Sequence, residues 1–293
     1  MNGGPVNGNV VNDGAGAGAT PVLRIDDVVV RFGGVTALDQ VSLAVPPASL
    51  IGLVGPNGAG KTTLFGVCSG LLRPAAGRVG LLGQDVTGLS PQRRARLGLA
   101  RTFQQPEIFR GLSVADHLRL AYRARHQRSR LWRDMVTGGG FRSPGREENE
   151  RVDFLLDLLT LTDLADTPAD VLPLGTTRLV EVGRALAGGP QVVLLDEPLS
   201  GLDPGESTHL AAALRRTVDV EGTSLLLVEH DVAMVLSLCS TIHVLDFGRQ
   251  IASGPPDVIR NDPAVKAAYL GDAPVEATPT SPAPVSTAQQ ENA

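Results

Sequence analysis

The 293-residue chain holds few cysteines, and nothing around them suggests a disulfide framework or a zinc site. Its only cysteines are Cys68 and Cys239, which fall in segments expected to be helical. No metal-ligand pattern surrounds either one, and two cysteines cannot form a disulfide framework that stabilises a chain of this length. We therefore expect two free thiols buried in the core.

Long apolar runs and a secretory signal are also missing. The most hydrophobic stretch, residues 41–54, is interrupted by Pro46 and Pro47, so no segment reaches the roughly 18 apolar residues of a membrane-spanning helix. Residues 1–20 lack a basic start and an apolar stretch, which argues against secretion. The sequence predicts a soluble protein that stays in the cytoplasm.

A strong positive charge is absent too. The net charge is −5, which argues against broad nucleic-acid binding. One local basic cluster consists of Arg119, Arg123, Arg125, Arg128, Arg130 and Arg133. A solvated helix face is the default interpretation of this cluster, and a membrane-proximal patch or a partner contact is the alternative.

What the chain does contain is a complete phosphate-binding loop after an apolar strand at residues 50–54. The loop reads Gly55, Pro56, Asn57, Gly58, Ala59, Gly60, Lys61 and Thr62, followed by Thr63. Its glycines let backbone N–H groups converge on phosphate oxygens at the start of a helix. Lys61 is placed to reach the β- and γ-phosphates, and Thr62 to hold Mg²⁺. We assign Thr63 to the same nucleotide site.

An acidic pair lies far downstream, after the apolar run at residues 192–195. Asp196 has the position of a magnesium-linked acid, and Glu197 that of the residue that orients or deprotonates an attacking water. The plainer alternative is a pair of acids that merely ends a strand at the surface. Together with the phosphate loop, the pair favours a nucleotidase.

The order of strand-like and helical patterns predicts an α/β fold. We expect strands at residues 23–32, 41–45, 50–54, 192–195, 224–229 and 241–245, with a turn at Gly33 and Gly34. The first two read as an antiparallel edge leading to the phosphate-loop strand. Helical patterns recur from about residue 90.

These motifs, in order, resemble those of the ATP-binding cassette ATPases over residues 22–272. The resemblance implies a P-loop NTPase core with an antiparallel β-subdomain and an inserted α-helical subdomain at about 90–187. The ATP-binding domain would occupy residues 21–272. Residues 1–20 and 273–293 are expected to be disordered tails.

The resemblance also assigns further site residues. Phe32 stands where the family stacks an aromatic ring on adenine, and a core phenylalanine is the alternative. Gln104 resembles the glutamine that approaches Mg²⁺ and water when the subdomains close. His230 resembles the histidine that contacts the γ-phosphate. Asp203 ends a loop that couples two sites across a dimer, with a plain turn as the alternative.

One motif departs from the family. The signature of the family normally reads Leu-Ser-Gly-Gly-Gln. In this chain, residues 172–176 read Leu-Pro-Leu-Gly-Thr and precede a helix expected at 178–187. Pro173 offers neither a hydroxyl nor an N–H. Gly175 and the helix N-terminus remain to contact the phosphate held by the other subunit. We interpret the signature as weakened, so that full turnover needs a partner ATPase with a better one.

Three segments indicate which subfamily of these ATPases the chain resembles: residues 101–104, the insertion 122–150 and the ending 268–271. They look like the ATPases of branched-chain amino-acid importers, with urea or amide importers as the alternative. This implies ATP and Mg²⁺ as cofactors, integral-membrane permease subunits, and a second ATPase subunit in a homo- or heterodimer. A solute-binding protein would act indirectly, and the chain would sit on the inner face of the cell membrane.

Two other functions stay open. A soluble cassette protein acting on DNA or the ribosome usually has a long coiled-coil insertion or two cassettes, and neither is seen here. A regulatory half of a heterodimer would hydrolyse ATP slowly because of Pro173. The presence of Glu197 and His230 argues against complete inactivity.

Overall fold

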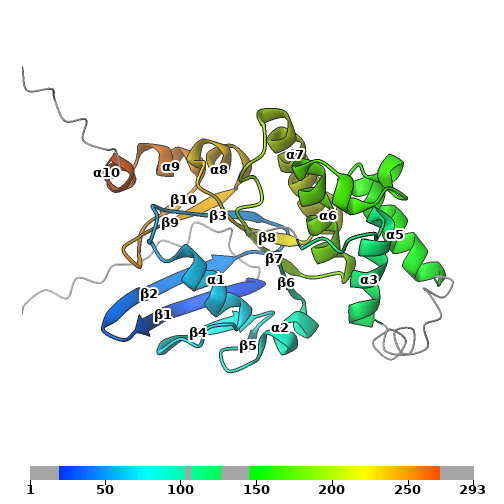
Figure 1. Cartoon of the computed structure of the whole chain (residues 1–293). Helices are drawn as coiled ribbons and strands as arrows, with labels where there is room; N and C mark the ends of the chain where they lie inside the picture. Colours follow the sequence, from blue (N-terminus) through cyan, green and yellow to red (C-terminus); the bar gives the residue numbers. More distant parts are fainter. Residues whose placement is uncertain (1–19, 103–106, 127–144, 271–293) are drawn as a thin grey trace, which may run out of the picture.

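The computed structural model describes residues 20–102, 107–126 and 145–270, which form two sheets and a set of helices (Figure 1). One sheet has four antiparallel strands in the order β2-β1-β4-β5. These strands are β1 (Leu23–Phe32), β2 (Val35–Val45), β4 (Ala76–Leu81) and β5 (Gln84–Asp85). A turn that contains Gly33 joins β1 to β2.

The second sheet has six strands in the order β10-β9-β3-β8-β7-β6. They are β3 (Leu50–Val54), β6 (Leu99–Arg101), β7 (Val192–Asp196), β8 (Ser224–Val228), β9 (Thr241–Asp246) and β10 (Arg249–Gly254). Neighbouring strands are parallel, except that β10 runs antiparallel to β9.

The central strands β3, β7 and β8 are buried along their whole length and mostly apolar, as expected where both faces of a sheet are covered. Successive side chains point to opposite faces. In β7, Val193 and Leu195 belong to one hydrophobic cluster, and Val192 and Leu194 belong to the other. The first cluster extends into the helical part, and the second into the antiparallel sheet. The sheet therefore joins both halves of the core.

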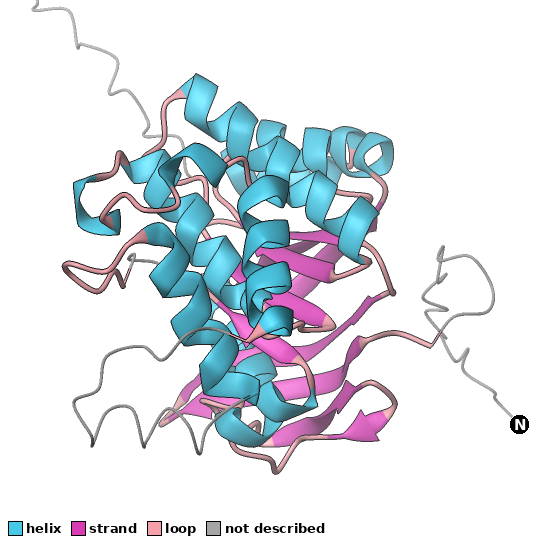
Figure 2. Cartoon of the chain, turned by 90° about the vertical axis from the view of Figure 1, so that its right-hand side faces the viewer, coloured by secondary structure: helices cyan, strands magenta, loops and turns pink. Residues whose placement is uncertain are grey.

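The helices complete this arrangement. They are α1 (Lys61–Ser69), α2 (Pro91–Leu97), α3 (Val114–His126), α5 (Arg146–Leu158), α6 (Leu174–Ala187), α7 (Pro204–Glu221), α8 (Val232–Leu238), α9 (Pro256–Asn261) and α10 (Pro263–Leu270), with short 3₁₀ turns at Thr162–Leu164 and Ala169–Val171. Helices α3, α5 and α6 form a lobe beside β6 and β7 (Figure 1). Figure 2 views the molecule from that side, with helices in front of the strands.

The structure differs from the sequence-based expectations in three places. Strands β1 and β2 pair in antiparallel fashion, as predicted, but they lie in a four-stranded sheet with β4 and β5 and do not pair with the phosphate-loop strand β3. Strand β6, which was not predicted, lies within the helical range yet pairs with β7. Helix α6 begins at Leu174 rather than at residue 178, so Gly175 lies inside its first turn.

Some expectations fall outside the described residues. These concern most of the two tails (1–19 and 271–293), the centre of the insertion (127–144), Gln104, and Arg128, Arg130 and Arg133.

The described members of the basic cluster are not a plain solvated face. Arg123 is buried, and its Nε donates to Glu148 Oε1 at 2.6 Å, which ties α3 to α5. Arg119 pairs with Asp116 on the same helix. Arg125 donates to the carbonyl of Ala95 at the end of α2. These arginines support the helical lobe.

Both cysteines are free and buried, as predicted from the sequence. Burial raises the pKa of the Cys68 thiol, on α1, to about 12. Burial also raises the pKa of the Cys239 thiol, after α8, to about 12. Neither thiol is a nucleophile at neutral pH, because the thiolate is the reactive form.

Arg94 is a fully buried cation under the phosphate-loop helix. Its NH1 donates to the carbonyls of Val67 (2.6 Å) and Cys68 (2.8 Å), in the last turn of α1. NH2 donates to Thr87 at 3.1 Å, and Nε to Leu89 at 3.2 Å. These carbonyls lie at a helix C-terminus and in a loop, where intrahelical partners run out. Arg94 thus fixes the end of α1.

We predict that Arg94→Lys destabilises the protein by about 2–4 kcal/mol, because an ammonium cannot reproduce the planar fork of donors and leaves buried carbonyls unpaired. The measurement is the free energy of unfolding in urea. Arg93→Lys, on the exposed side of the same helix, is the matched control and should change stability by no more than about 0.5 kcal/mol. Equal effects at both positions would contradict this role of Arg94.

Candidate functional site

The phosphate loop joins β3 to α1, and its glycines are required by close backbone contacts. Gly55 and Gly60 have positive φ angles of 153° and 104°. A Cβ added at Gly55 would lie 2.1 Å from the Leu245 carbonyl oxygen, and one at Gly60 would lie 2.9 Å from that of Ala37. Only glycine fits both positions. The loop is therefore held against β9 and β2, ahead of a helix N-terminus.

Lys61, the first residue of α1, is folded back over this loop. It is buried, and its Nζ donates to the carbonyls of Gly55 (2.6 Å) and Pro56 (3.0 Å). Burial lowers the pKa of Lys61, while the charges of Glu197 and Asp196 raise it. The loop follows β3 and the acid pair lies at the end of β7, and both strands run parallel to β8, which lies between them, so their carboxyl ends share one edge of the sheet. The predicted loop, lysine and acid pair therefore share one site.

Of the other loop residues, Ala59 is buried in the core, whereas several lie at the surface of this site. Asn57, Gly58 and Thr62 are exposed, and Thr63 is half-buried. A hollow of about 610 Å³ lies beside the loop and is also lined by Phe247 and by α10. No motif in the sequence indicated that the loop and the C-terminal helix α10 line the same hollow.

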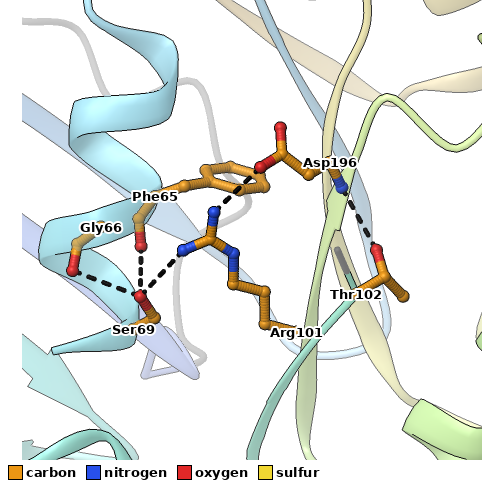
Figure 3. Close-up of polar contacts among 6 residues, drawn as sticks. All are labelled: Phe65, Gly66, Ser69, Arg101, Thr102 and Asp196. Atoms are coloured by element: carbon orange, nitrogen blue, oxygen red, sulfur yellow. Dashed lines mark hydrogen bonds and ion pairs between the residues drawn. The ribbon is translucent and has the colours of Figure 1, made fainter. Parts of the chain in front are cut away.

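Asp196 ends β7 in a buried position. Its Oδ2 accepts a hydrogen bond from Arg101 NH2 at 2.9 Å, and its backbone N donates to Thr102 Oγ1 at 3.3 Å (Figure 3). Both partners come from the end of β6 and the residue after it. The neighbouring strand thus fixes the orientation of the carboxylate. Arg101 was not among the predicted site residues.

Glu197 and His230 meet directly. They follow β7 and β8, two adjacent parallel strands whose carboxyl ends share an edge. Glu197 Oε1 lies 2.6 Å from His230 Nε2. Glu197 also has a φ of 48°, a left-handed conformation that is strained for this residue type. Its backbone N donates to the Val228 carbonyl at 2.9 Å, which holds it in place.

Glu229 is a buried acid that sequence reasoning passed over. Its Oε1 accepts from the Leu199 N–H at 2.6 Å, and its Oε2 from the His230 N–H at 3.3 Å. Burial raises its pKa to about 7, against these backbone hydrogen bonds, which lower it. Glu229 therefore links the loop after Glu197 to His230. Its place directly after an apolar strand was the available signal.

A second group of predicted residues gathers at the start of α7. Asp203 caps this helix, since its Oδ1 accepts from the Glu206 N–H at 2.8 Å. Glu206 in turn accepts from the Asp203 N–H at 3.2 Å, which completes a capping box. Its other oxygen, Oε1, accepts from the Gly175 N–H at 3.1 Å. Glu206 thus joins two motifs that the sequence placed far apart.

Gly175 needs to be glycine for this contact. A Cβ there would come within 2.6 Å of Glu206 Oε1. Pro173 is the N-cap of α6 and provides no side-chain cap. The Glu206 carboxylate therefore faces the first turn of α6, where exposed N–H groups favour an anion.

Phe32 ends β1 with 51% of its surface exposed, so its ring is accessible for stacking rather than buried in the core. It pairs with Val35 at the start of β2. Two residues further on, the Ala37 carbonyl packs against the phosphate loop at Gly60. Gln104 lies outside the described residues, but Thr102 before it is anchored to Asp196.

This arrangement suits anion binding followed by proton chemistry. Loop amides, a helix N-terminus and Lys61 face one place, and a carboxylate paired with a histidine stands beside it. No group of three or more metal-binding side chains occurs among the described residues. None of the described helices is long and apolar enough to span a membrane.

The raised pKa of Glu229 leads to a prediction about how stability depends on pH. Its folded pKa of about 7 exceeds the ordinary value of 4.5, so the unfolded chain releases this proton first as the pH rises. Glu229 therefore destabilises the folded state little below pH 4.5 and progressively more as the pH rises to 7. In Glu229→Gln, the free energy of unfolding relative to wild type should rise by up to about 3 kcal/mol across this window. Urea unfolding at several pH values measures it, and a flat difference would contradict the prediction.

Comparison with known proteins places this site in a family. The family model described as "ABC transporter" matches residues 38–200. A second model, described as "Branched-chain amino acid ATP-binding cassette transporter", matches residues 249–274. The first match contains the phosphate loop and the acid pair, and the second covers β10, α9 and α10.

Two relatives agree with this. The chain is 35% identical over 255 residues to the high-affinity branched-chain amino acid transport ATP-binding protein LivG of Escherichia coli K12, covering 86% of this chain and 99% of LivG. It is 37% identical over 233 residues to the lipopolysaccharide export system ATP-binding protein LptB of Acidithiobacillus ferridurans, covering 80% of this chain and 90% of LptB.

Among solved structures, the ADP conformation of MJ1267, an ATP-binding cassette of an ABC transporter, superposes with a TM-score of 0.76 at 31% identity, covering 86% of this chain and 100% of that one. The mixed α/β architecture and the resemblance to the ATP-binding cassette ATPases are thereby confirmed. The chain belongs to the ABC transporter family, as an ATP-binding, ATP-hydrolysing subunit.

Proposed function

We propose that this chain powers the import of branched-chain amino acids. The observation that carries the choice of solute is the match at residues 249–274 to a model described for branched-chain amino acid transporters. The likeness to LivG over 86% of the chain supports it. The likeness to LptB, named for an export system, covers 80% and makes export the competing direction.

In this proposal the phosphate loop and Lys61 bind the ATP phosphates. The exposed N-terminal turn of α1 presents Thr62, and β7 presents Asp196, so a hydroxyl and a carboxylate oxygen are available for Mg²⁺. Oxygen donors of this kind fit that ion. Bound Mg²⁺ would supply charge neutralisation at the phosphates. Gln104, which follows Thr102, is assigned to the same place.

Glu197 acts on the attacking water. One of its oxygens contacts His230, which orients the carboxylate to accept a proton from the water or to position the water. His230 holds the carboxylate in place and contacts the γ-phosphate. The strained backbone of Glu197 fits a residue held for function rather than for stability.

Phe32, Asp203 and Gly175 serve nucleotide binding across a dimer. Phe32 stacks on the base. Gly175 contacts the phosphate held by a second ATPase subunit, which is either another copy of this chain or a related one, and Asp203 couples the two sites. The capping box at Asp203 and the shared Glu206 give these residues a fixed geometry from which to act.

The permease subunits need a surface that touches both the core and the helical lobe. A hollow of about 540 Å³ does so, lined by α2, β6, α3 and α6, with a mainly apolar floor and arginines around it. We assign it to a segment of the permease, which would place the chain on the inner face of the membrane. A solute-binding protein would act through the permease.

The test is reconstitution with the permease subunits in lipid vesicles, together with the solute-binding protein on the face opposite this chain. Mg²⁺ and ATP should drive leucine, and not urea, toward the face that carries this chain. Glu197→Gln should lower both ATP hydrolysis and transport at least about a hundredfold, because it removes the base. It should still bind nucleotide, which is measured separately with a fluorescent ATP analogue.

Glu150→Gln, on the exposed face of α5, removes the same charge elsewhere and should leave both rates near wild type. Leucine movement in the opposite direction would favour an exporter, and urea transport would favour the amide importers. Negligible hydrolysis by the complete wild-type complex would favour the slow regulatory half.

The weakened signature gives a further prediction. Pro173→Ser would supply a hydroxyl at the N-cap of α6 and should raise turnover at saturating ATP if Pro173 limits it. The cap adds roughly 1 kcal/mol of stability, which the more flexible unfolded chain offsets. We therefore expect a change in rate with a small change in urea stability. An unchanged or lower rate would count against the weakened-signature hypothesis.

A further inference from the structure

Arg101 forms a buried contact that the proposed chemistry does not use. It ends β6, and its side chain is only 14% exposed, while that of Asp196 is 8% exposed. The guanidinium NH2 donates to Asp196 Oδ2 at 2.9 Å, and NH1 donates to Ser69 Oγ at 3.2 Å (Figure 3). The same group lies over the ring of Phe65, 5.8 Å from its centroid.

Its supports come from α1, the helix that follows the phosphate loop. Ser69 Oγ donates to the Phe65 carbonyl at 2.8 Å, so its oxygen is turned to accept from Arg101. The ring of Phe65 is fully buried. The guanidinium is thus fixed between the helix of the phosphate loop and the carboxylate at the end of β7 (Figure 3).

This ion pair is poorly explained by stability alone. Within the described residues, the Arg101 Nε is buried without a hydrogen-bond partner. Burying a charged pair with an unsatisfied donor is costly, and apolar side chains often replace such pairs without loss. We therefore look for the role of the Arg101 charge in its effect on the Asp196 carboxylate.

Arg101 is the cation that contacts Asp196 directly among the described residues. Lys61 is the other candidate, but its Nζ hydrogen bonds go to loop carbonyls. A guanidinium at 2.9 Å neutralises much of the charge that Asp196 would offer to another cation. Mg²⁺ near the same carboxylate would be repelled by the arginine.

We propose that Arg101 is a positioning residue that serves as the resident counter-cation of Asp196. It holds the carboxylate in the buried site, and it competes with Mg²⁺, so that arrival of a magnesium–nucleotide complex must loosen the contact. This inference rests on the proposed role of Asp196 as the magnesium-linked acid. It adds a residue that sets how much Mg²⁺ the site requires.

The location of Arg101 connects this competition to the partner surface. Arg101 also lines the hollow that we assign to the permease, together with β6, α3 and α6. A segment bound there would contact the strand that carries the guanidinium. Displacement of Arg101 would free Asp196, and permease binding would thereby lower the Mg²⁺ requirement.

The test measures binding rather than turnover. In a Glu197→Gln background, which prevents hydrolysis, binding of a fluorescent ATP analogue is titrated with Mg²⁺. We expect Arg101→Met to lower the half-saturating Mg²⁺ concentration roughly fivefold, because the competing charge is gone. Arg101→Lys keeps the charge and should stay close to the parent. Arg93→Met, on the exposed face of α2, removes an arginine charge elsewhere and should change nothing.

If Arg101→Met fails to fold, Ser69→Ala provides a second test, because it removes one hydrogen-bond partner of the guanidinium. It should also lower the half-saturating Mg²⁺ concentration, but by less. An unchanged or higher Mg²⁺ requirement in these variants, in a parent that depends on Mg²⁺, overturns the counter-cation role. A parent without Mg²⁺ dependence, or dependence that survives Asp196→Asn intact, instead overturns the proposed role of Asp196.

Discussion

The carboxyl edge of the parallel sheet is the constraint on which the rest of the molecule depends. Strands β3, β8 and β7 lie side by side, and each is fully buried. A strand buried on both faces has no room for charge, so polar residues appear only where it ends. Because the strands are parallel, those ends meet at one edge. The phosphate loop, the acid pair and His230 are thereby brought together from distant parts of the sequence.

At this edge the partner of each acid, rather than its residue type, determines what it can do. Asp196 is held by a guanidinium, Glu197 contacts an imidazole, and Glu229 is held by backbone N–H groups. Without a contacting cation to offset its burial, Glu229 has its pKa raised to about 7. Under the proposed function, the three acids at this edge have three tasks: Asp196 faces the metal, Glu197 is the base, and Glu229 is a hydrogen-bonding link.

The loop and the acid pair could be singled out from the sequence because each consists of a few consecutive residues at the end of an apolar run, whereas His230 was assigned from the family resemblance. Arg101, Glu206 and Glu229 were missed because their roles depend on contacts with distant residues. Strand β6 was missed because three residues carry no periodic pattern. The separate sheet of β1 and β2 could not be read from either strand alone, since it depends on pairing with β4.

The departure at the signature is best understood through Glu206. This carboxylate accepts from Gly175 in α6 and from Asp203 before α7, and the side chain of Leu174 packs near Gly201. The first turn of α6 and the loop before α7 are therefore joined in one hydrogen-bonded unit. An anion approaching the Gly175 N–H would compete with the Glu206 carboxylate, whose other oxygen completes the capping box at Asp203. The loss of serine at Pro173 removes a hydroxyl from this turn, but it leaves the link between the two motifs intact.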